Sequence, residues 1–238
     1  MTPMQPVELL DNYYAEMLCC TPAEFSGAKN IVVPHQDMKR IRFAHGLSLA
    51  VYAMSKSQAT VFALKPDLAD ILCNFLKDAP PCTLNEELCN EVEYCLAPYV
   101  NAAFWFRGYR LFCEPATFVD CSFGEVRDIT AEDPSAWHMS QFWGGPVFGQ
   151  IVDGKPVTWC CVKTLSDTVW DLSIETHPDY RGRGYAKSTV STAVKYCFAH
   201  GKLVGWGCDR DNVASLRTAL SVGFQHYALD FGCEEKTQ

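Results

Sequence analysis

Hydrophobic and polar positions along the first half of the chain predict a mixture of helices and strands. Apolar residues recur at helical spacing over residues 7–18, and two apolar runs flank the polar turn at 55–57 as paired strands would. Thr83 and Glu86 have the spacing of a capping box, which predicts the start of a helix that ends before Pro98. The expected order is helix, strand, strand, helix, helix and strand, over residues 7–18, 47–54, 59–64, 66–76, 84–97 and 101–113.

The second half alternates more regularly between strands and helices. Asp153 and Gly154 lie between two apolar runs and favour a tight hairpin turn. Residues 185–199 carry an apolar stripe at helical spacing, which predicts a helix packed on a sheet. Strands are expected over residues 125–129, 147–152, 157–162, 168–176, 204–208 and 224–231, and helices over 134–143, 185–199 and 212–222.

These two sets of elements predict two domains in a chain of 238 residues. We place the boundary after residue 122. This gives a smaller N-terminal α/β domain over residues 1–122 and a second domain over 123–238. No composition typical of a flexible linker marks the junction, so the two domains are expected to pack tightly. The predicted fold class is α+β, of the three-layer α/β type.

Composition and charge exclude several functional classes. Hydrophobic residues make up 48% of the chain and charged residues 20%, as in a folded globular protein. The formal net charge is −8, which disfavours an interface with nucleic acid. The basic run of Lys39, Arg40 and Arg42 is short and is interpreted as a solvated turn, so no nucleic-acid interface is expected there either. No signal-peptide pattern and no run of 18 apolar residues occurs, so we expect a cytoplasmic protein without a membrane span.

Thirteen cysteines raise the question of a metal site or a disulfide framework. Two pairs are adjacent, no Cys-x-x-Cys pair occurs, and the six histidines do not stand at zinc spacing beside the cysteines. Cys73, Cys89, Cys95 and Cys197 fall on apolar faces of predicted helices. We therefore expect buried free thiols that act as small hydrophobic side chains, and no metal.

The candidate binding site is the turn between the strand at 168–176 and the helix at 185–199. The first N–H groups of a helix have no intrahelical acceptors and carry the positive end of the helix dipole. Two glycines permit close approach of a ligand to the backbone, and two arginines add positive charge, so the turn suits a phosphate or pyrophosphate. Its residues are Arg181, Gly182, Arg183, Gly184, Tyr185 and Ala186.

Two nucleotide-binding motifs fail at this turn. A dinucleotide fingerprint that starts at Gly182 would need Gly or Ala where Lys187 stands. A Walker A loop that ends in Lys187 and Ser188 would need Gly at positions 181 and 186, which hold Arg and Ala. The pattern that remains is Arg-x-x-Gly-x-Ala over residues 181–186.

This turn and its flanks resemble the GNAT acyltransferases. In that family an [RQ]-x-x-G-x-[GA] loop binds the pyrophosphate of acyl-coenzyme A and follows the fourth strand, which residues 174–180 resemble. The second motif of the family is a strand, an asparagine, a small residue three positions later, a helix and Gly-Phe. The matching positions are 204–208, Asn212, Ser215 and 223–224. The resemblance covers residues 125–231 and implies a GNAT fold with a mixed, mostly antiparallel sheet.

A narrower resemblance concerns the GNAT subfamily that includes the zwittermicin-resistance acetyltransferase. It rests on Ile-Glu-Thr, Tyr-Arg-Gly-x-Gly-x-Ala, Trp-x-Cys and Asn-x-x-Ser, at residues 174–176, 180–186, 206–208 and 212–215. One departure concerns the end of the fold. Only 14 residues follow Phe224, which is enough for one closing strand instead of the usual pair. We expect the N-terminal domain to supply a covering strand, through residues 47–54 or 101–113, and to close one wall of the acceptor pocket.

Strand periodicity divides residues 170–175 between two faces. One face carries Asp171, Ser173 and Glu175, and the other carries Trp170, Leu172 and Ile174. If the Trp face packs on a helix, the acidic face lines the cleft of the acyl donor. A carboxylate at that cleft can accept the proton of an attacking ammonium group, so Glu175 is the first candidate for the general base and Asp171 the second.

The resemblance implies roles for four further residues. In the family's geometry the backbone N–H of Thr176 points at the thioester carbonyl, where it stabilises the oxyanion, and Ile174 contributes to cofactor binding beside it. Asn212 and Ser215 are implied to contact the pantetheine or phosphate part of coenzyme A, while their chemistry also suits helix capping.

The general acid is the open step of the mechanism. The family often protonates the departing thiolate with a tyrosine on the last helix, and the matching residue here is Ala219. Tyr227, Tyr185 and water remain as candidates. A thiol with a pKa near ~8.5 is also a tolerable leaving group without an acid.

The resemblance implies an N-acyltransferase that transfers acetyl from acetyl-CoA, as co-substrate, to the amine of a small molecule. An antibiotic or an amino-acid-like metabolite would fit, with direct attack through a tetrahedral intermediate. Two alternatives stay open. One is a GNAT-type transferase with an aminoacyl-tRNA or carrier-protein donor, and the other is a non-catalytic module that binds coenzyme A. The sequence does not identify the acceptor or the oligomeric state.

Overall fold

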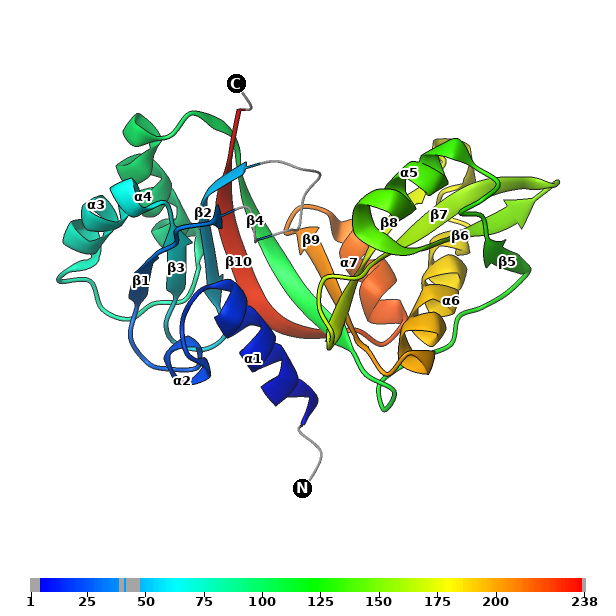
Figure 1. The fold of residues 1–238 in the computed structure, drawn as a ribbon, viewed down its shortest axis with the longest axis horizontal. Coiled ribbons are helices and arrows are strands. Elements are labelled where there is room, and N and C mark those ends of the chain that lie inside the picture. Colours follow the sequence, from blue (N-terminus) through cyan, green and yellow to red (C-terminus); the bar gives the residue numbers. More distant parts are fainter. Residues whose placement is uncertain (1–4, 39–40, 42–47, 237–238) are drawn as a thin grey trace. The chain divides into compact units, whose positions relative to one another are not determined.

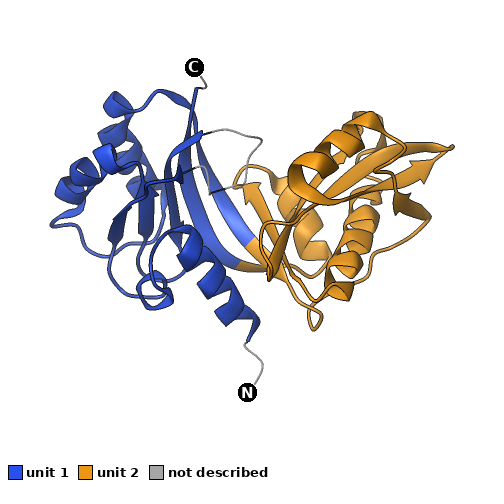
Figure 2. Ribbon diagram, in the orientation of Figure 1, with its two compact units in different colours: residues 1–110, 227–238 blue, residues 111–226 orange. Residues whose placement is uncertain are grey.

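The computed structural model describes residues 5–38, 41 and 48–236 (Figure 1), and the chain divides into two compact units. Unit 1 consists of residues 1–110 and 227–238, and unit 2 consists of residues 111–226 (Figure 2). The chain therefore passes from one unit to the other after residues 110 and 226, whereas the sequence predicts a domain boundary after residue 122. The short basic run of Lys39, Arg40 and Arg42 lies outside the described residues. No helix in the described part of the chain has both the length and the apolar character needed to span a membrane.

Unit 1 is a mixed sheet with helices. Its strands follow the order β1-β3-β2-β10-β4, in which β1 and β3 are parallel and β2 is antiparallel to both β3 and β10. The last strand of the chain thus pairs with strands from the beginning of the chain. The elements are α1 (Pro6–Met17), α2 (Pro22–Phe25), β1 (Ile31–Pro34), β2 (Ser48–Ser55), β3 (Val61–Leu64), α3 (Pro66–Leu76), α4 (Glu86–Leu96), a 3-10 turn (Ala97–Tyr99), β4 (Ala102–Cys113) and β10 (Gln225–Glu235).

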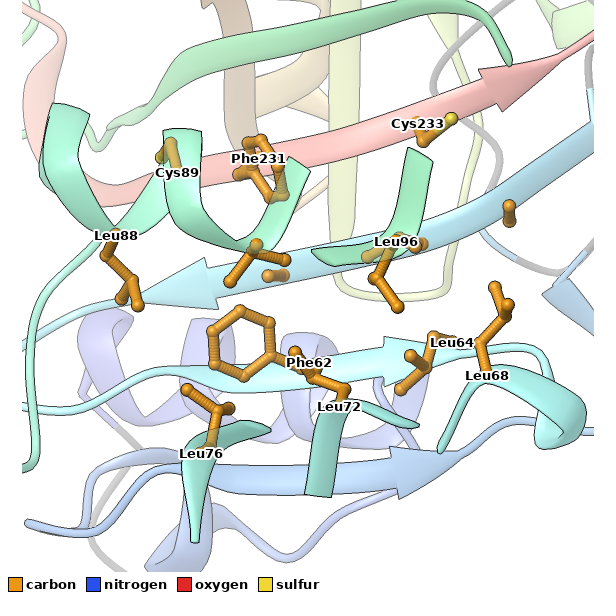
Figure 3. Packing of buried hydrophobic residues seen from close by; sticks show 14 of the residues in the cluster. Phe62, Leu64, Leu68, Leu72, Leu76, Leu88, Cys89, Leu96, Phe231 and Cys233 are labelled. Carbon is orange, nitrogen blue, oxygen red and sulfur yellow. The ribbon is translucent and has the colours of Figure 1, made fainter. Parts of the chain in front are cut away.

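The core of unit 1 lies between this sheet and helices α3 and α4 (Figure 3). Leu72 of α3 and Leu96 of α4 are fully buried against Phe62 of β3 and Phe231 of β10. Trp105 of β4 stacks on the Phe231 ring with 5.3 Å between the ring centroids. Burial of apolar area drives this packing, so β10 is an integral part of the unit 1 core.

Three local predictions in unit 1 are corrected. Helix α4 is capped by Asn85, whose side chain accepts a hydrogen bond from the Leu88 N–H at 2.8 Å, so the Thr83 capping box is wrong. Strand β1 and helix α2 were not expected, because each has only four residues and shows no period. Cys73 on α3 is exposed rather than on the apolar face.

The pairing of β10 leads to a prediction about truncation. A fragment of residues 122–238 would carry β10 without β2, the strand that pairs with Leu229–Glu235 in the full chain. Phe231 and Cys233, which are fully buried in unit 1, would lose their packing partners. We expect this fragment to be insoluble or inactive, because an exposed apolar strand aggregates. The measurements are its soluble fraction and its rate in the transfer reaction that the sequence resemblance implies, each against the full chain.

A fragment of residues 122–226 is the matched comparison, since it lacks β10 and shares the same N-terminal truncation. It should be more soluble than the longer fragment. A soluble and fully active 122–238 fragment would contradict the prediction and show that the N-terminal domain is an appendage.

Unit 2 is a mostly antiparallel sheet in the order β9-β8-β7-β6-β5, in which only the β8–β9 pair is parallel. The expected hairpin is confirmed, because Asp153 and Gly154 both have positive φ, at 51° and 76°, as a tight turn between strands requires. The elements are β5 (Glu125–Asp128), α5 (Pro134–Trp143), β6 (Gly144–Val152), β7 (Lys155–Lys163), β8 (Val169–Thr176), a 3-10 turn (Pro178–Tyr180), α6 (Tyr185–Ala199), β9 (Leu203–Asp209) and α7 (Val213–Ser221).

Helices α5 and α6 cover opposite faces of this sheet. Cys161 of β7 packs in a cluster with Ala136 and Trp143 of α5. The hydroxyl of Thr158, also in β7, is hydrogen-bonded to the hydroxyl of Thr189 in α6. Because neighbouring residues of a strand point to opposite faces, the two contacts lie on different sides of the sheet. The predicted three-layer arrangement is confirmed for unit 2.

All thirteen cysteines are free. Burial raises the pKa of the Cys160 thiol well above its ordinary value, and burial raises the pKa of Cys161 to about 11 and that of Cys197 to about 12. These thiols stay protonated at neutral pH and act as small apolar side chains. Within the described residues, no group of three or more metal-ligating side chains occurs.

Candidate active site

The candidate site is a cavity of about 590 Å³ at the place where strands β8 and β9 part. In the described structure the two strands pair only from Val169 to Asp171 on β8 and from Leu203 to Gly205 on β9. Beyond that point β8 continues to Thr176 without β9 beside it. The cavity brings together ten of the eleven predicted site residues, namely Ile174, Glu175, Thr176, Arg181, Gly182, Gly184, Tyr185, Ala186, Asn212 and Ser215.

The parting of the strands leaves backbone groups of β8 free for a ligand. The His177 N–H donates to the Val157 carbonyl at 2.9 Å, on the β7 side. Because successive N–H groups of a strand alternate in direction, those of Thr176 and Ile174 point to the other side, where β9 has departed. The Thr176 N–H thus has the direction that the sequence resemblance implies for it.

Asp171 has a structural role at the point where β8 and β9 separate. Its Oδ1 accepts a hydrogen bond from the Leu172 N–H at 2.7 Å, and Leu172 is the first residue of β8 beyond the paired segment. The Asp171 side chain is buried and is not among the residues that line the cavity. Asp171 therefore accepts from a buried backbone donor at the end of the paired segment, while Glu175 of the same face is exposed and lines the cavity.

The other face of β8 packs on a helix, as the periodicity requires. The Trp170 ring is stacked on Tyr196 of α6 with 6.2 Å between centroids, and it also contacts His200. The face of β8 that carries Trp170 thus packs on a helix. This was the condition under which the acidic face was expected to line the cleft of the acyl donor. Of the three residues of that face, Glu175 reaches the cavity.

The phosphate-binding turn has the backbone geometry expected of it. Gly182 and Gly184 have φ of 74° and 83°, values that residues with a Cβ rarely adopt. Gly184 is the N-cap of α6 and has no side chain to accept from the first N–H groups of the helix, so these donors remain for a ligand. The Arg181 Nε donates to the Thr176 carbonyl at 3.1 Å, which ties the turn to the end of β8.

Arg183 is the predicted site residue that does not line the cavity. Its guanidinium lies over the Tyr180 ring, with 5.4 Å to the ring centroid, and the residue is exposed. The Arg-x-x-Gly-x-Ala pattern includes Arg181 and leaves position 183 variable, so Arg183 was predicted from its place in the turn and its charge alone.

Residues of the second motif also line the cavity. Asn212 is the N-cap of α7, and its Oδ1 accepts a hydrogen bond from the Ser215 N–H at 3.0 Å. The Ser215 Oγ accepts a hydrogen bond from the Trp206 Nε1 at 3.1 Å, so the hydroxyl hydrogen of Ser215 is left to donate. Asn212 caps α7 and Ser215 lies in its first turn, and both residues line the cavity.

Residues 110–224 match the family model described as the acetyltransferase (GNAT) family. Residues 110–224 are a GNAT acetyltransferase domain. No curated protein matches the chain.

Several solved structures are similar to parts or all of this chain. An acetyltransferase from the GNAT family of Colwellia psychrerythraea is similar over 98% of each chain, with 15% identity and a TM-score of 0.52, and this likeness concerns the fold alone. A GCN5-related N-acetyltransferase from Kribbella flavida covers 62% of this chain and 64% of its own, with 16% identity and a TM-score of 0.47. The Salmonella typhimurium protein yncA, solved with acetyl-CoA, covers 44% and 72%, with 18% identity and a TM-score of 0.35.

The candidate tyrosines differ in how well they could protonate the departing thiolate. Ala219, at the position where the family often has tyrosine, is fully buried in α7. Tyr185 lines the cavity. Tyr227 belongs to unit 1, where its hydroxyl donates to Asp11 at 2.6 Å and burial raises its pKa far above the ordinary value. Tyr227 is therefore poorly suited to give up a proton.

Sequence reasoning missed several residues that line the cavity. Tyr180, Lys187, Ala214, Arg217 and Thr218 were not expected there. The α7 residues among them stand at i, i+3 and i+4, so they share one face of the helix. This spacing could have been read once Asn212 was assigned to the start of α7.

Proposed function

We propose that this protein transfers the acetyl group of acetyl-CoA to the amine of a small molecule. The observation that carries the proposal is the coincidence of the phosphate-binding turn, the free N–H of Thr176 and the Glu175 carboxylate in one cavity of unit 2. GNAT acetyltransferases use acetyl-CoA, and the residues present fit its parts. The N–H groups at the start of α6 and Arg181 would hold the pyrophosphate. Ile174, Asn212 and Ser215 would hold the pantetheine arm.

The reaction follows from the placement of Thr176 and Glu175. The amine nitrogen attacks the thioester carbon, so a C–N bond forms while the carbonyl becomes an oxyanion. The Thr176 N–H donates to that oxyanion and lowers the barrier, because a positioned donor needs no reorganisation as charge develops. Glu175 takes the proton from the amine. The C–S bond then breaks and coenzyme A leaves as a thiolate, whose ordinary pKa near ~8.5 makes departure feasible without a tyrosine.

Glu175 also supports an amine as the nucleophile. An ammonium group is attracted to a carboxylate and must lose a proton before it can attack, and one side chain can serve both needs. The acceptor is proposed to be a small amine, such as an antibiotic or an amino-acid-like metabolite, in keeping with the subfamily that residues 174–186 resemble. The 1–122 segment is proposed to contribute to acceptor binding.

The proposal is tested by thiol release from acetyl-CoA in the presence of a panel of amines, including amino acids and aminoglycosides. Release that depends on one amine, with the acetylated amine identified by mass spectrometry, supports it. Coenzyme A binding without turnover on any amine would favour a non-catalytic module. Transfer from aminoacyl-tRNA or an acyl carrier protein, but not from acetyl-CoA, would favour a different donor.

A further inference from the structure

The lining of the cavity includes side chains that the proposed function does not use. Lys187 lines the cavity from the first turn of α6, and Arg217 lines it from α7, together with Ala214 and Thr218 of the same helix face. The two cationic side chains therefore come from different helices and face one cavity. Neither has a role in holding the turn, the pantetheine arm or the reacting groups.

The charge of these two cations is not balanced within the part of the chain that the structure describes. Among those residues, no ion pair or side-chain hydrogen bond involves the Lys187 ammonium or the Arg217 guanidinium. Arg181 adds a third cation to the lining, and Glu175 is its only carboxylate among the described residues. Like charges around one cavity repel each other, so the arrangement favours an anion. It is a local excess of positive charge in a chain whose net charge is −8.

Coenzyme A has one anionic group that the proposed site leaves unassigned. The pyrophosphate is taken by the turn, and the acyl end must reach Thr176, so the adenosine end leaves the turn on its other side. That end carries the 3′-phosphate, with a charge of about −2 at neutral pH. A separate phosphate needs donors other than the N–H groups that the pyrophosphate already uses. We infer that Lys187 and Arg217 bind the 3′-phosphate and so select coenzyme A over 3′-dephospho-coenzyme A.

This inference rests on the proposed binding of coenzyme A and adds a source of donor specificity. The two side chains differ in what they offer. Arg217 presents a planar fork that matches two phosphate oxygens, whereas Lys187 acts as a point charge. Arg217 is the more exposed of the two, so its contribution will be reduced by solvent and salt.

The test measures dissociation constants for coenzyme A and 3′-dephospho-coenzyme A by calorimetry. The wild-type protein should bind coenzyme A about tenfold more tightly. Arg217→Gln should reduce this ratio to about threefold, and the double variant Lys187→Gln, Arg217→Gln should reduce it to about one, because no cation then distinguishes the two ligands. The wild-type ratio should also fall at higher ionic strength. A ratio measured on one preparation does not depend on the fraction of protein that is folded.

Lys155→Gln is the matched control, since Lys155 is an exposed cation of the same unit that does not line the cavity and has no role in the turn. It should keep the wild-type ratio. A wild-type protein that binds both ligands equally tightly, or a double variant that keeps the wild-type ratio, would overturn the inference and leave the proposed function intact. A wild-type protein that binds neither ligand would overturn both.

Discussion

Gly184→Asp is expected to abolish binding of coenzyme A, with a dissociation constant raised by roughly 10² or more. The φ of 83° at Gly184 costs a residue with a Cβ about 1–2 kcal/mol. The carboxylate would also stand at the start of α6, where the pyrophosphate must bind, and placing like charges together costs several kcal/mol. Calorimetry with coenzyme A measures the effect.

Two variants separate these causes. Gly184→Asn keeps the strain without the charge, so it should weaken binding by much less. Gly201→Asp adds the same side chain at another glycine with positive φ, 68°, where a Cβ would meet no heavy atom within 4 Å. Gly201 does not line the cavity, and its variant should bind as wild type does. Unchanged affinity in Gly184→Asp would reject the turn as the pyrophosphate site.

Local features of the site could be predicted because short segments encode them. The helix expected over residues 185–199 is α6, Tyr185–Ala199, and the strand expected over 168–176 is β8, Val169–Thr176. Their boundaries follow from a glycine that ends the turn and from apolar spacing, both of which are readable within a few residues. For the same reason Asn212 could be assigned as the cap of α7.

Features that depend on strand pairing could not be predicted. The separation of β8 from β9 after Asp171 depends on two segments that are about thirty residues apart, and no side-chain pattern in either segment encodes it. Asp171 and Glu175 were therefore placed on one face correctly but could not be given different roles. For β10 the sequence predicted only that residues 47–54 or 101–113 would supply a covering strand. The strand β2, Ser48–Ser55, pairs with β10, but the register of that pairing could not be predicted.

Lys187 and Arg217 illustrate a third limit. Single cations on helices are usually solvated, and nothing in the sequence relates position 187 to position 217. They become informative only because both line one cavity. When two helices each contribute one side chain to a binding site, the site can be recognised from the fold but not from the sequence of either helix.

Asp171→Ala is expected to reduce stability and to leave the rate of the folded enzyme within about threefold. The substitution removes the Oδ1 that accepts from the buried Leu172 N–H, and the loss of such a buried hydrogen bond costs about 1–3 kcal/mol of unfolding free energy. Denaturant unfolding measures this loss. Asp171 does not line the cavity, so a large fall in rate at unchanged stability would contradict its structural role.

Glu175→Gln should have the opposite outcome, with a slower reaction and an intact fold. The introduced amide would keep the size and the hydrogen-bonding oxygen of the side chain but could not take the proton of the attacking amine, so the acylation rate should fall by roughly 10² or more. Affinity for coenzyme A should change little, because the pyrophosphate is held by the turn at residues 181–186. The free energy of unfolding should be unchanged, because Glu175 is exposed. Single-turnover rates with the amine found in the acceptor screen, measured across pH together with calorimetry of the donor, separate these effects. A wild-type rate at every pH would remove Glu175 from the mechanism and leave water as the base, whereas a loss of donor affinity would assign Glu175 to binding instead of proton transfer.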